Sequence, residues 1–134
     1  MRDLSTYDYA LIRVVPRVER GEFINAGVIV SCQDSAFLEA RIELDEQRLR
    51  ALDATLDLES VRRHLEAIVS VCRGDPYSGP IGKMSRRERF DWLTAPRSTS
   101  IQTSAVHSGR CTDIGVVIEH LLDTMVRAPH AASR

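Results

Sequence analysis

The sequence predicts a single α+β domain: a four-stranded, mainly antiparallel sheet with helices packed on one of its faces. The chain has 134 residues and a hydrophobic content of 43%, which is enough for one core. Its first third alternates apolar and polar residues between short connections, as antiparallel strands do. Later segments place apolar residues at helical spacing. The expected order of elements is therefore β-β-β-α-α-α-β-α.

Three strands are predicted in the first third of the chain. They cover residues 7–15, 23–32 and 37–44. Pro16 ends the first strand, because proline cannot continue a hydrogen-bonded ladder. The second strand is expected to place on one face Ile24, Ala26, Val28, Val30 and Cys32. Gly27 inside it suggests a bulge or a close backbone approach. The third strand alternates strictly with charged residues, so one face of the sheet is expected to be wet.

Helices and a fourth strand follow. The expected helices lie within residues 45–53, 57–73, 85–93 and 113–128, and the fourth strand covers 97–106. Asp57, Ser85 and Asp113 are expected N-caps, and Gly74 ends the second helix. The chain is expected to form one domain over 1–134, with a core from 7 to 127 and a frayed tail at 128–134. Whether the fourth strand is central or at an edge stays open.

Composition excludes several classes of protein. The formal net charge is only -1, which argues against a strongly basic nucleic-acid binder. No apolar run is long enough for a membrane span, and the N-terminus lacks the apolar segment of a secretory signal. Cys32, Cys72 and Cys111 lie about forty residues apart, a spacing that suggests neither disulfides nor zinc. We therefore expect a cytoplasmic protein without metal or cofactor, and the oligomeric state stays open.

No catalytic signature is present in the sequence. The glycine-rich dinucleotide motif, the phosphate-binding loop, the zinc-protease motif and the hydrolase nucleophile elbow are all missing. The absence of known motifs favours a non-enzymatic role while leaving catalysis open. What remains is a set of four residue groups, each with a structural alternative.

The first group lies in the connection between the first two strands. Arg17 and Arg20 flank a turn that contains Gly21, and two guanidinium groups there could hold a phosphate or carboxylate together with Asn25. The alternative is a solvated loop in which Arg20 pairs with Glu22. Asn25 would then bond to backbone at a bulge.

The second group lies on the expected fourth strand. Ser98, Ser100 and Gln102 alternate on one predicted face, continued by Ser104, and Arg97 would supply the positive charge of an anion-binding cleft. The alternative is an edge strand kept polar to prevent pairing between sheets.

Histidines form the third group. His107 precedes a Ser-Gly pair and is the candidate for general acid or base catalysis, because its ordinary pKa lies near neutrality. His64 and His120 lie in amphipathic helices, where a packed position, or one at the border between the apolar and polar faces, is the simpler explanation.

The fourth group is a short basic helix. Arg86, Arg87 and Trp92 form a candidate partner-binding surface, because arginine and tryptophan are frequent hot spots at interfaces. The same helix could hold single-stranded nucleic acid, but Glu88 and Asp91 dilute its charge. Packing of Phe90, Trp92 or both in the core is the structural alternative.

Four segments of the chain resemble a known bacterial family. They read YALIRVVP at 9–16, RGEFINAGV at 20–28, RIELD at 41–45 and APRSTSIQ at 95–102. They are similar to the domain-of-unknown-function family 3037, over nearly the whole chain from 7 to 126. The resemblance assigns no activity, but it implies a protein partner, a kinase similar to the HipA toxin family.

These observations favour a non-catalytic accessory domain that binds a protein partner. The alternative is a small sensor or enzyme for a phosphorylated or nucleotide ligand. In that case Arg17, Arg20 and Arg97 would hold the anion and His107 would handle a proton.

Overall fold

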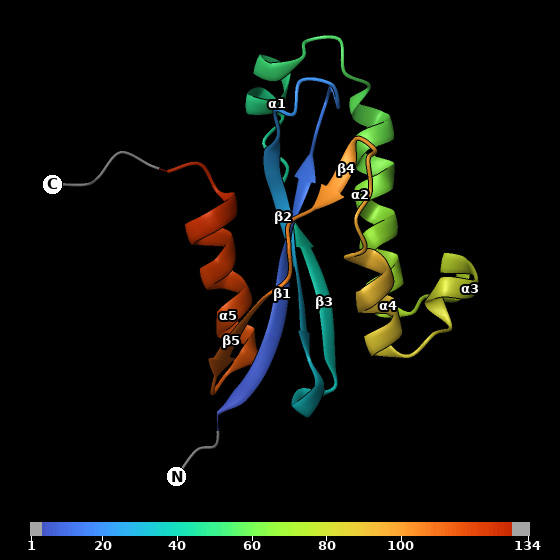
Figure 1. Cartoon of the computed structure of the whole chain (residues 1–134), viewed down its shortest axis with the longest axis vertical. Helices are drawn as coiled ribbons and strands as arrows, with labels where there is room; N and C mark the ends of the chain where they lie inside the picture. Colours follow the sequence, from blue (N-terminus) through green and yellow to red (C-terminus); the bar gives the residue numbers. More distant parts are fainter. Residues whose placement is uncertain (1–3, 130–134) are drawn as a thin grey trace, which may run out of the picture.

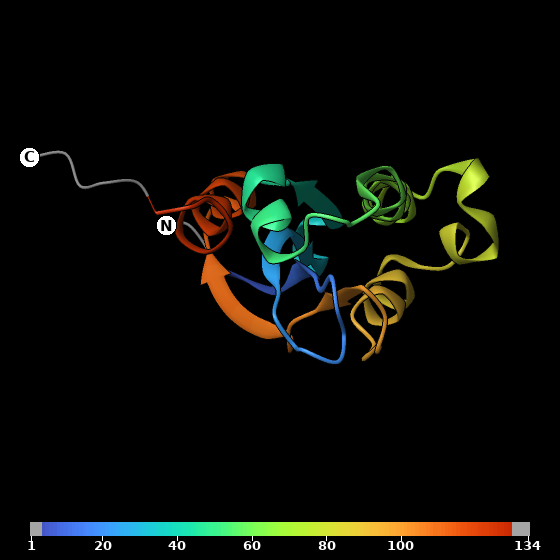
Figure 2. The ribbon, with the colours of Figure 1, turned by 90° about the horizontal axis from the view of Figure 1, so that it is seen from above.

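The computed structural model describes residues 4–129, and it is a sheet with helices on both faces (Figures 1 and 2). The strands are β1 (Ser5–Val14), β2 (Ile24–Cys32), β3 (Phe37–Ile42), β4 (Ile101–Thr103) and β5 (His107–Cys111). The helices are α1 (Glu46–Leu52), α2 (Leu58–Arg73), α3 (Gly79–Gly82), α4 (Arg86–Leu93) and α5 (Ile114–Leu121). Short turns complete the list: η1 (Gln33–Ser35), η2 (Pro76–Ser78) and the π-helical η3 (Leu122–Val126). Most of the predicted tail, 128–134, lies outside the described residues.

The sheet is antiparallel throughout and confirms the α+β class. Its strand order is β3-β2-β1-β4, and β5 joins the same edge of β1 that β4 occupies. The two short strands divide that edge: β4 pairs with residues 12–14 of β1, and β5 with residues 5–9. Of the strand that the sequence predicts over 97–106, the structure forms only β4, and β5 lies beyond it in a segment for which no strand is predicted. The sequence of β5, HSGRC, carries no apolar alternation, so its pairing depends on β1 and could not be predicted locally.

Gly27 forms the bulge that its position in the second strand suggests. Ile12 pairs with Gly27 and Arg13 pairs with Asn25, so Ala26 is an extra residue in β2. A side chain at Gly27 would also place its Cβ 2.5 Å from the carbonyl oxygen of Arg41 on β3. Both parts of the Gly27 prediction are therefore confirmed.

The bulge also reverses the alternation of β2. Ile24 and Ala26 face the first core, whereas Val28 and Val30, beyond the bulge, face the second. The prediction that the alternating apolar residues of this strand share one face was wrong. A sequence pattern of period two cannot show that an inserted residue changes the face.

Two apolar cores lie on opposite faces of the sheet. The first is closed by α1, α2 and α4, and its fully buried residues include Ile12, Val14, Ile29, Leu49 and Phe90. The second lies between Val28, Val30 and the α5–η3 segment, which supplies Ile118, Leu121, Leu122 and Val126. The prediction of helices on one face was therefore wrong for α5. The apolar residues that the bulge turns to the second face pack against the α5–η3 segment. Figure 2 shows α5 on the opposite side of the sheet from α2 and α4.

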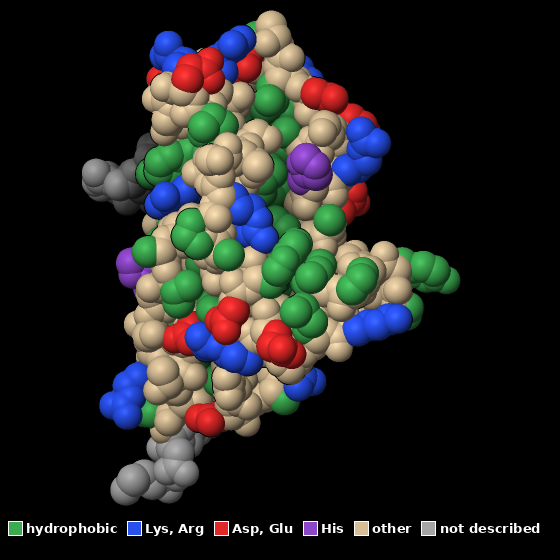
Figure 3. Space-filling view, turned by 45° about the vertical axis from the view of Figure 1, so that its right-hand side comes forward, with side chains coloured by type: hydrophobic (Ala, Val, Ile, Leu, Met, Phe, Trp, Pro, Cys, Tyr) green, Lys and Arg blue, Asp and Glu red, His purple; other side chains and the backbone are tan. Residues whose placement is uncertain are grey.

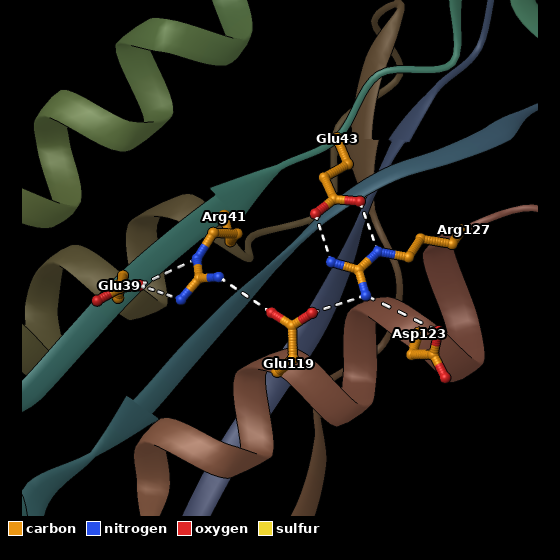
Figure 4. A network of polar contacts seen from close by, with 6 residues as sticks. All are labelled: Glu39, Arg41, Glu43, Glu119, Asp123 and Arg127. Atoms are coloured by element: carbon orange, nitrogen blue, oxygen red, sulfur yellow. Dashed lines mark hydrogen bonds and ion pairs between the residues drawn. The ribbon is translucent and has the colours of Figure 1, made fainter.

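A network of ion pairs joins α5 and η3 to the charged side of β3 (Figure 4). Arg127 donates to both carboxylate oxygens of Glu43 at 2.7 and 2.8 Å, and its Nη1 lies 2.7 Å from Glu119. Glu119 also pairs with Arg41 of β3 at 3.3 Å. The charged side chains at 39 and 41 are partly exposed to water, as expected, and Arg41 also pairs with Glu119 of α5.

We predict that this network stabilises the fold only above the acidic range. The two hydrogen bonds from Arg127 lower the pKa of Glu43. A carboxyl whose pKa is lower in the folded state contributes stability above its unfolded pKa and loses that contribution as the pH falls through the folded pKa. Arg127→Met should therefore lower the Tm at about pH 7, and the difference from wild type should narrow towards about pH 3.

Thermal denaturation followed by circular dichroism measures this difference. The matched control is Arg110→Met, because Arg110 is exposed on β5 and should show little difference at either pH. A Tm difference for Arg127→Met that does not change with pH contradicts the prediction.

Candidate functional site

The candidate site is a pocket of about 340 Å³ between α2, the end of α4 and β4. Its lining is mostly apolar. The residues that line it are His64, Ala67, Ile68, Val71, Trp92, Leu93, Arg97, Thr99, Ser100, Ile101, Gln102 and Thr103. Figure 3 shows hydrophobic side chains inside a hollow of this face, with basic and histidine side chains near it.

The pocket forms where three segments meet without filling the space between them. On α2, His64, Ala67, Ile68 and Val71 follow helical spacing and therefore share one side of the helix. Helix α4 ends at Leu93, and the segment around Pro96 leads away from it into β4. Because β4 is only three residues long and pairs on one side with β1, its other edge borders the pocket. Within the described residues β4 is thus an edge strand.

Arg97 fixes the mouth of the pocket. Its Nη2 donates to the carbonyl of Trp92 at 2.8 Å, and its Nη1 donates to the carbonyl of Leu93 at 3.1 Å. These carbonyls belong to the last turn of α4, so the guanidinium caps that helix and meets the negative end of its dipole. The guanidinium also lies over the Trp92 ring, 4.6 Å from its centre. Arg97 and Trp92 are therefore held as one rigid unit.

The two aromatic residues of α4 have different environments. Phe90 is fully buried in the first core, while 43% of Trp92 is exposed at the pocket. Residues two apart point to different sides of a helix, as the sequence predicts for this pair. Packing in the core therefore accounts for Phe90 but not for Trp92.

Two of the arginines of α4 interact mainly with other groups of this chain. Arg87 pairs with Asp8 at 3.0 Å and with Asp91 at 3.1 Å, and its bond to Asp8 raises its pKa. Arg89 is 8% exposed and donates to main-chain carbonyls. Arg86 is exposed and Trp92 borders the pocket, so of the predicted partner-binding residues these two present free surface.

The structure brings together only part of the predicted anion site. Arg97, Ser100 and Gln102 line the pocket, whereas Ser98 is exposed outside its lining. The predicted row of hydroxyls on one strand face does not form, because residues 98 and 100 precede β4. Ser104 is buried, and its hydroxyl accepts from the main-chain N–H of Leu11 at 2.9 Å.

The remaining predicted residues lie elsewhere. Arg17 pairs with Asp53 at 3.4 Å, and Arg20 pairs with Glu22 at 2.7 Å, as the structural alternative for that loop expects. These two side chains and Arg97 therefore do not form one anion site.

Asn25 and His107 also lie outside the pocket lining. Asn25 donates from Nδ2 to the carbonyl of Met125 at 3.0 Å, on the side of the sheet that α5 covers. His107 lies on β5 with its ring 5.5 Å from that of Tyr9.

Sequence reasoning missed two features. The sequence predicts His64 as a packed or boundary residue of an amphipathic helix, whereas it lines the pocket. Its spacing with Ile68 and Val71 places it on that side of α2, but nothing in the sequence shows that β4 leaves this side uncovered. Arg13 was read only as a strand residue. It stacks on Phe23 at 4.2 Å from the ring centre.

Other chemistries find little support among residues 4–129. No group of three His, Cys, Asp or Glu side chains in this part of the chain could hold a metal ion. Cys32 and Cys72 are buried free thiols, and burial raises the pKa of Cys72 to about 12. None of the described helices combines the length and the apolar character that a membrane crossing requires.

Comparison with known proteins gives one match. No curated protein and no solved structure is similar to the chain. One family model matches residues 9–126, which is most of the chain and includes β2 to β5, the part of β1 from residue 9 onward and every residue of the pocket. The chain therefore belongs to the family described as protein of unknown function (DUF3037).

Proposed function

We propose that the protein is a non-catalytic interaction module that binds an extended segment of a partner protein at the pocket. The observation that carries the proposal is the position of the pocket beside the free edge of β4, with Trp92 and Arg97 held rigidly at its mouth. The segment would add a strand to β4 and insert one apolar side chain between α2 and α4.

The size and lining of the pocket suit the binding of one apolar side chain. Its volume of about 340 Å³ lies at the low end of the range for ligand sites, about 300–1,000 Å³. Ile68, Val71 and Leu93 supply apolar surface, and half-exposed Trp92 adds an aromatic contact. Tryptophan and arginine in rigid positions are typical of the residues that dominate binding energy.

The backbone of β4 supports strand addition. The Ser100 carbonyl accepts from Val15, and the Ser104 N–H donates to Leu11, so these even-numbered residues direct their backbone groups at β1. In an antiparallel pair the residues between them point their groups the other way. The N–H groups of Ile101 and Thr103 are therefore available to a partner strand.

Charge narrows the choice of partner. Arg97 and His64 lie at the pocket, and its lining contains no carboxylate. A segment with an acidic residue next to its apolar anchor complements these groups. The family resemblance implies a HipA-like kinase, which is thus the first partner to test.

We predict that Trp92→Ala weakens partner binding at least tenfold without unfolding the protein, because it removes an interface anchor but no core residue. Thr103→Pro should weaken binding as well, because it deletes an outward N–H while leaving the bonds to β1 intact. The full chain would be used to capture the kinase, and affinity would be measured by titration calorimetry.

The matched control is Tyr77→Ala, because Tyr77 is a 99% exposed aromatic residue on η2, outside the pocket. It should bind like wild type. If all three variants bind the partner as tightly as wild type, the proposal is wrong. Loss with Trp92→Ala but not with Thr103→Pro retains the pocket and removes strand addition.

A further inference from the structure

We propose a second binding site, on the opposite face of the sheet, in which Arg13, Asn25 and Gln102 bind the carboxylate end of a small α-amino or α-hydroxy acid. The site does not depend on the proposed function, because Arg13 and Asn25 lie outside the pocket lining and only Gln102 borders both. It would make the protein responsive to a metabolite as well as to a partner.

Three neighbouring strands place these side chains in a row. Arg13 of β1 pairs with Asn25 of β2 on one side and with Gln102 of β4 on the other. Ile12 and Val14, which flank Arg13, are buried in the first core, so Arg13 points to the opposite face. Residues directly opposite in antiparallel strands share a face, which brings the guanidinium between the two amides.

Arg13 differs from the other arginines that the structure describes. Each of the others that is buried or half-buried donates to a carbonyl or carboxylate; these are Arg48, Arg89, Arg97 and Arg127. Within residues 4–129 the Arg13 side chain makes no hydrogen bond or ion pair, and its Nε is buried without an acceptor. Its guanidinium stacks on Phe23. A stacked guanidinium keeps its N–H edge for a carboxylate, which it binds through two parallel hydrogen bonds.

The two amides present acceptors. Asn25 Nδ2 donates to the Met125 carbonyl at 3.0 Å, and Gln102 Nε2 donates to the Thr99 carbonyl at 2.8 Å. Because a carbonyl only accepts, these bonds fix which end of each amide is oxygen. Asn25 Oδ1 is buried and receives no hydrogen bond. The complementary ligand thus combines a carboxylate for Arg13 with an adjacent ammonium or hydroxyl donor for Asn25.

Exposed apolar surface beside the row adds a third element. Phe23 is 44% exposed and its ring stacks against the guanidinium of Arg13. Met125 is 38% exposed, and its carbonyl accepts from Asn25. An aliphatic side chain on the ligand can pack on these two residues. The favoured class is therefore an α-amino or α-hydroxy acid with an apolar side chain.

Four matched probes test this class: leucine, its hydroxy analogue leucic acid, isocaproic acid, which lacks the donor, and isoamylamine, which lacks the carboxylate. Each is titrated into the 15N-labelled full chain. Asn25 is the only asparagine, so its side-chain amide signals report on the site, and Trp92, the only tryptophan, reports on the pocket. We expect saturable shifts at Asn25 with leucine or leucic acid, about fivefold weaker binding of isocaproic acid, and none of isoamylamine.

Substitutions separate binding from a structural role. Arg13→Met should abolish the shifts at Asn25 without lowering the Tm, because it removes a guanidinium that has no hydrogen-bond or ion-pair partner among residues 4–129 and keeps an apolar contact to Phe23. Arg110→Met, on β5, should bind like wild type.

Several results overturn the proposal. These are the absence of saturation at Asn25 with all four probes, undiminished binding to Arg13→Met, and shifts confined to Trp92. A large loss of Tm in Arg13→Met without any probe binding shows that Arg13 serves only to pack against Phe23.

Discussion

Replacing Arg89 by methionine should lower the free energy of unfolding by about 3 kcal/mol, although Arg89 has no carboxylate partner within residues 4–129. Its Nη1 donates to the carbonyls of Val71 and Cys72, both at 2.7 Å, and its Nε donates to that of Met84 at 3.0 Å. The first two carbonyls end α2, where the helix dipole is negative. Methionine fills similar space but removes all three hydrogen bonds; the Val71 carbonyl still accepts from the Gly74 N–H, whereas the Cys72 carbonyl loses the buried bond from Arg89.

Urea denaturation of wild type and variant measures the loss. Arg86→Met, three residues earlier on the exposed side of the same helix, should change stability by no more than about 0.5 kcal/mol. Arg89→Lys should recover only part of the loss, because one ammonium cannot reach all three carbonyls. If Arg89→Met changes the free energy of unfolding as little as Arg86→Met does, the C-terminal end of α2 does not need a buried cation.

Gly27→Ala should cost about 2–3 kcal/mol, although it adds a single methyl group. The new Cβ would lie 2.5 Å from the Arg41 carbonyl oxygen and 2.9 Å from Ile42 Cδ1. The carbonyl belongs to paired backbone, so relief requires that β2 and β3 separate at the bulge. The same movement would disturb the face assignment of Val28 beyond it.

Gly115→Ala is the matched control for this substitution. Gly115 lies in α5, and the nearest atom to its Cβ would be Asp113 Oδ1 at 3.4 Å, an ordinary contact. Alanine there should leave stability unchanged or raise it by up to about 1 kcal/mol, through helix propensity. Equal effects at both positions, measured by urea denaturation, would contradict the close approach at Gly27.

Local signals predict the elements of this fold better than they predict its layers. The expected N-caps are present: Asp57, Ser85 and Asp113 each accept from a backbone N–H of the first turn. Capping depends on a few adjacent residues, and for this reason the sequence reveals it. The position of α5 depends instead on the bulge at Gly27. The bulge changes the face to which the later residues of β2 point, and no local sequence pattern shows this change.

The candidate sites show the same limit. Asn25 and Gln102 are correctly identified as unusual polar residues in strands, but only the register of β1 reveals that Arg13 lies between them. The positive charge of Arg97 was assigned to a ligand, while the structure uses it to cap α4. Arginine satisfies carbonyls and carboxylates equally well, so residue type alone does not distinguish these roles.

The division of the outer edge of β1 between β4 and β5 has a consequence for how the protein is made. Both strands come from the last third of the chain, about ninety to a hundred residues after their partners in β1. During translation the β1–β2–β3 hairpins can form while that edge is still bare, and a bare edge pairs readily with other nascent chains. That edge of β1 therefore lacks its partner strands until residues 101–111 have emerged, and the period of synthesis before then is when the chain is most open to mispairing.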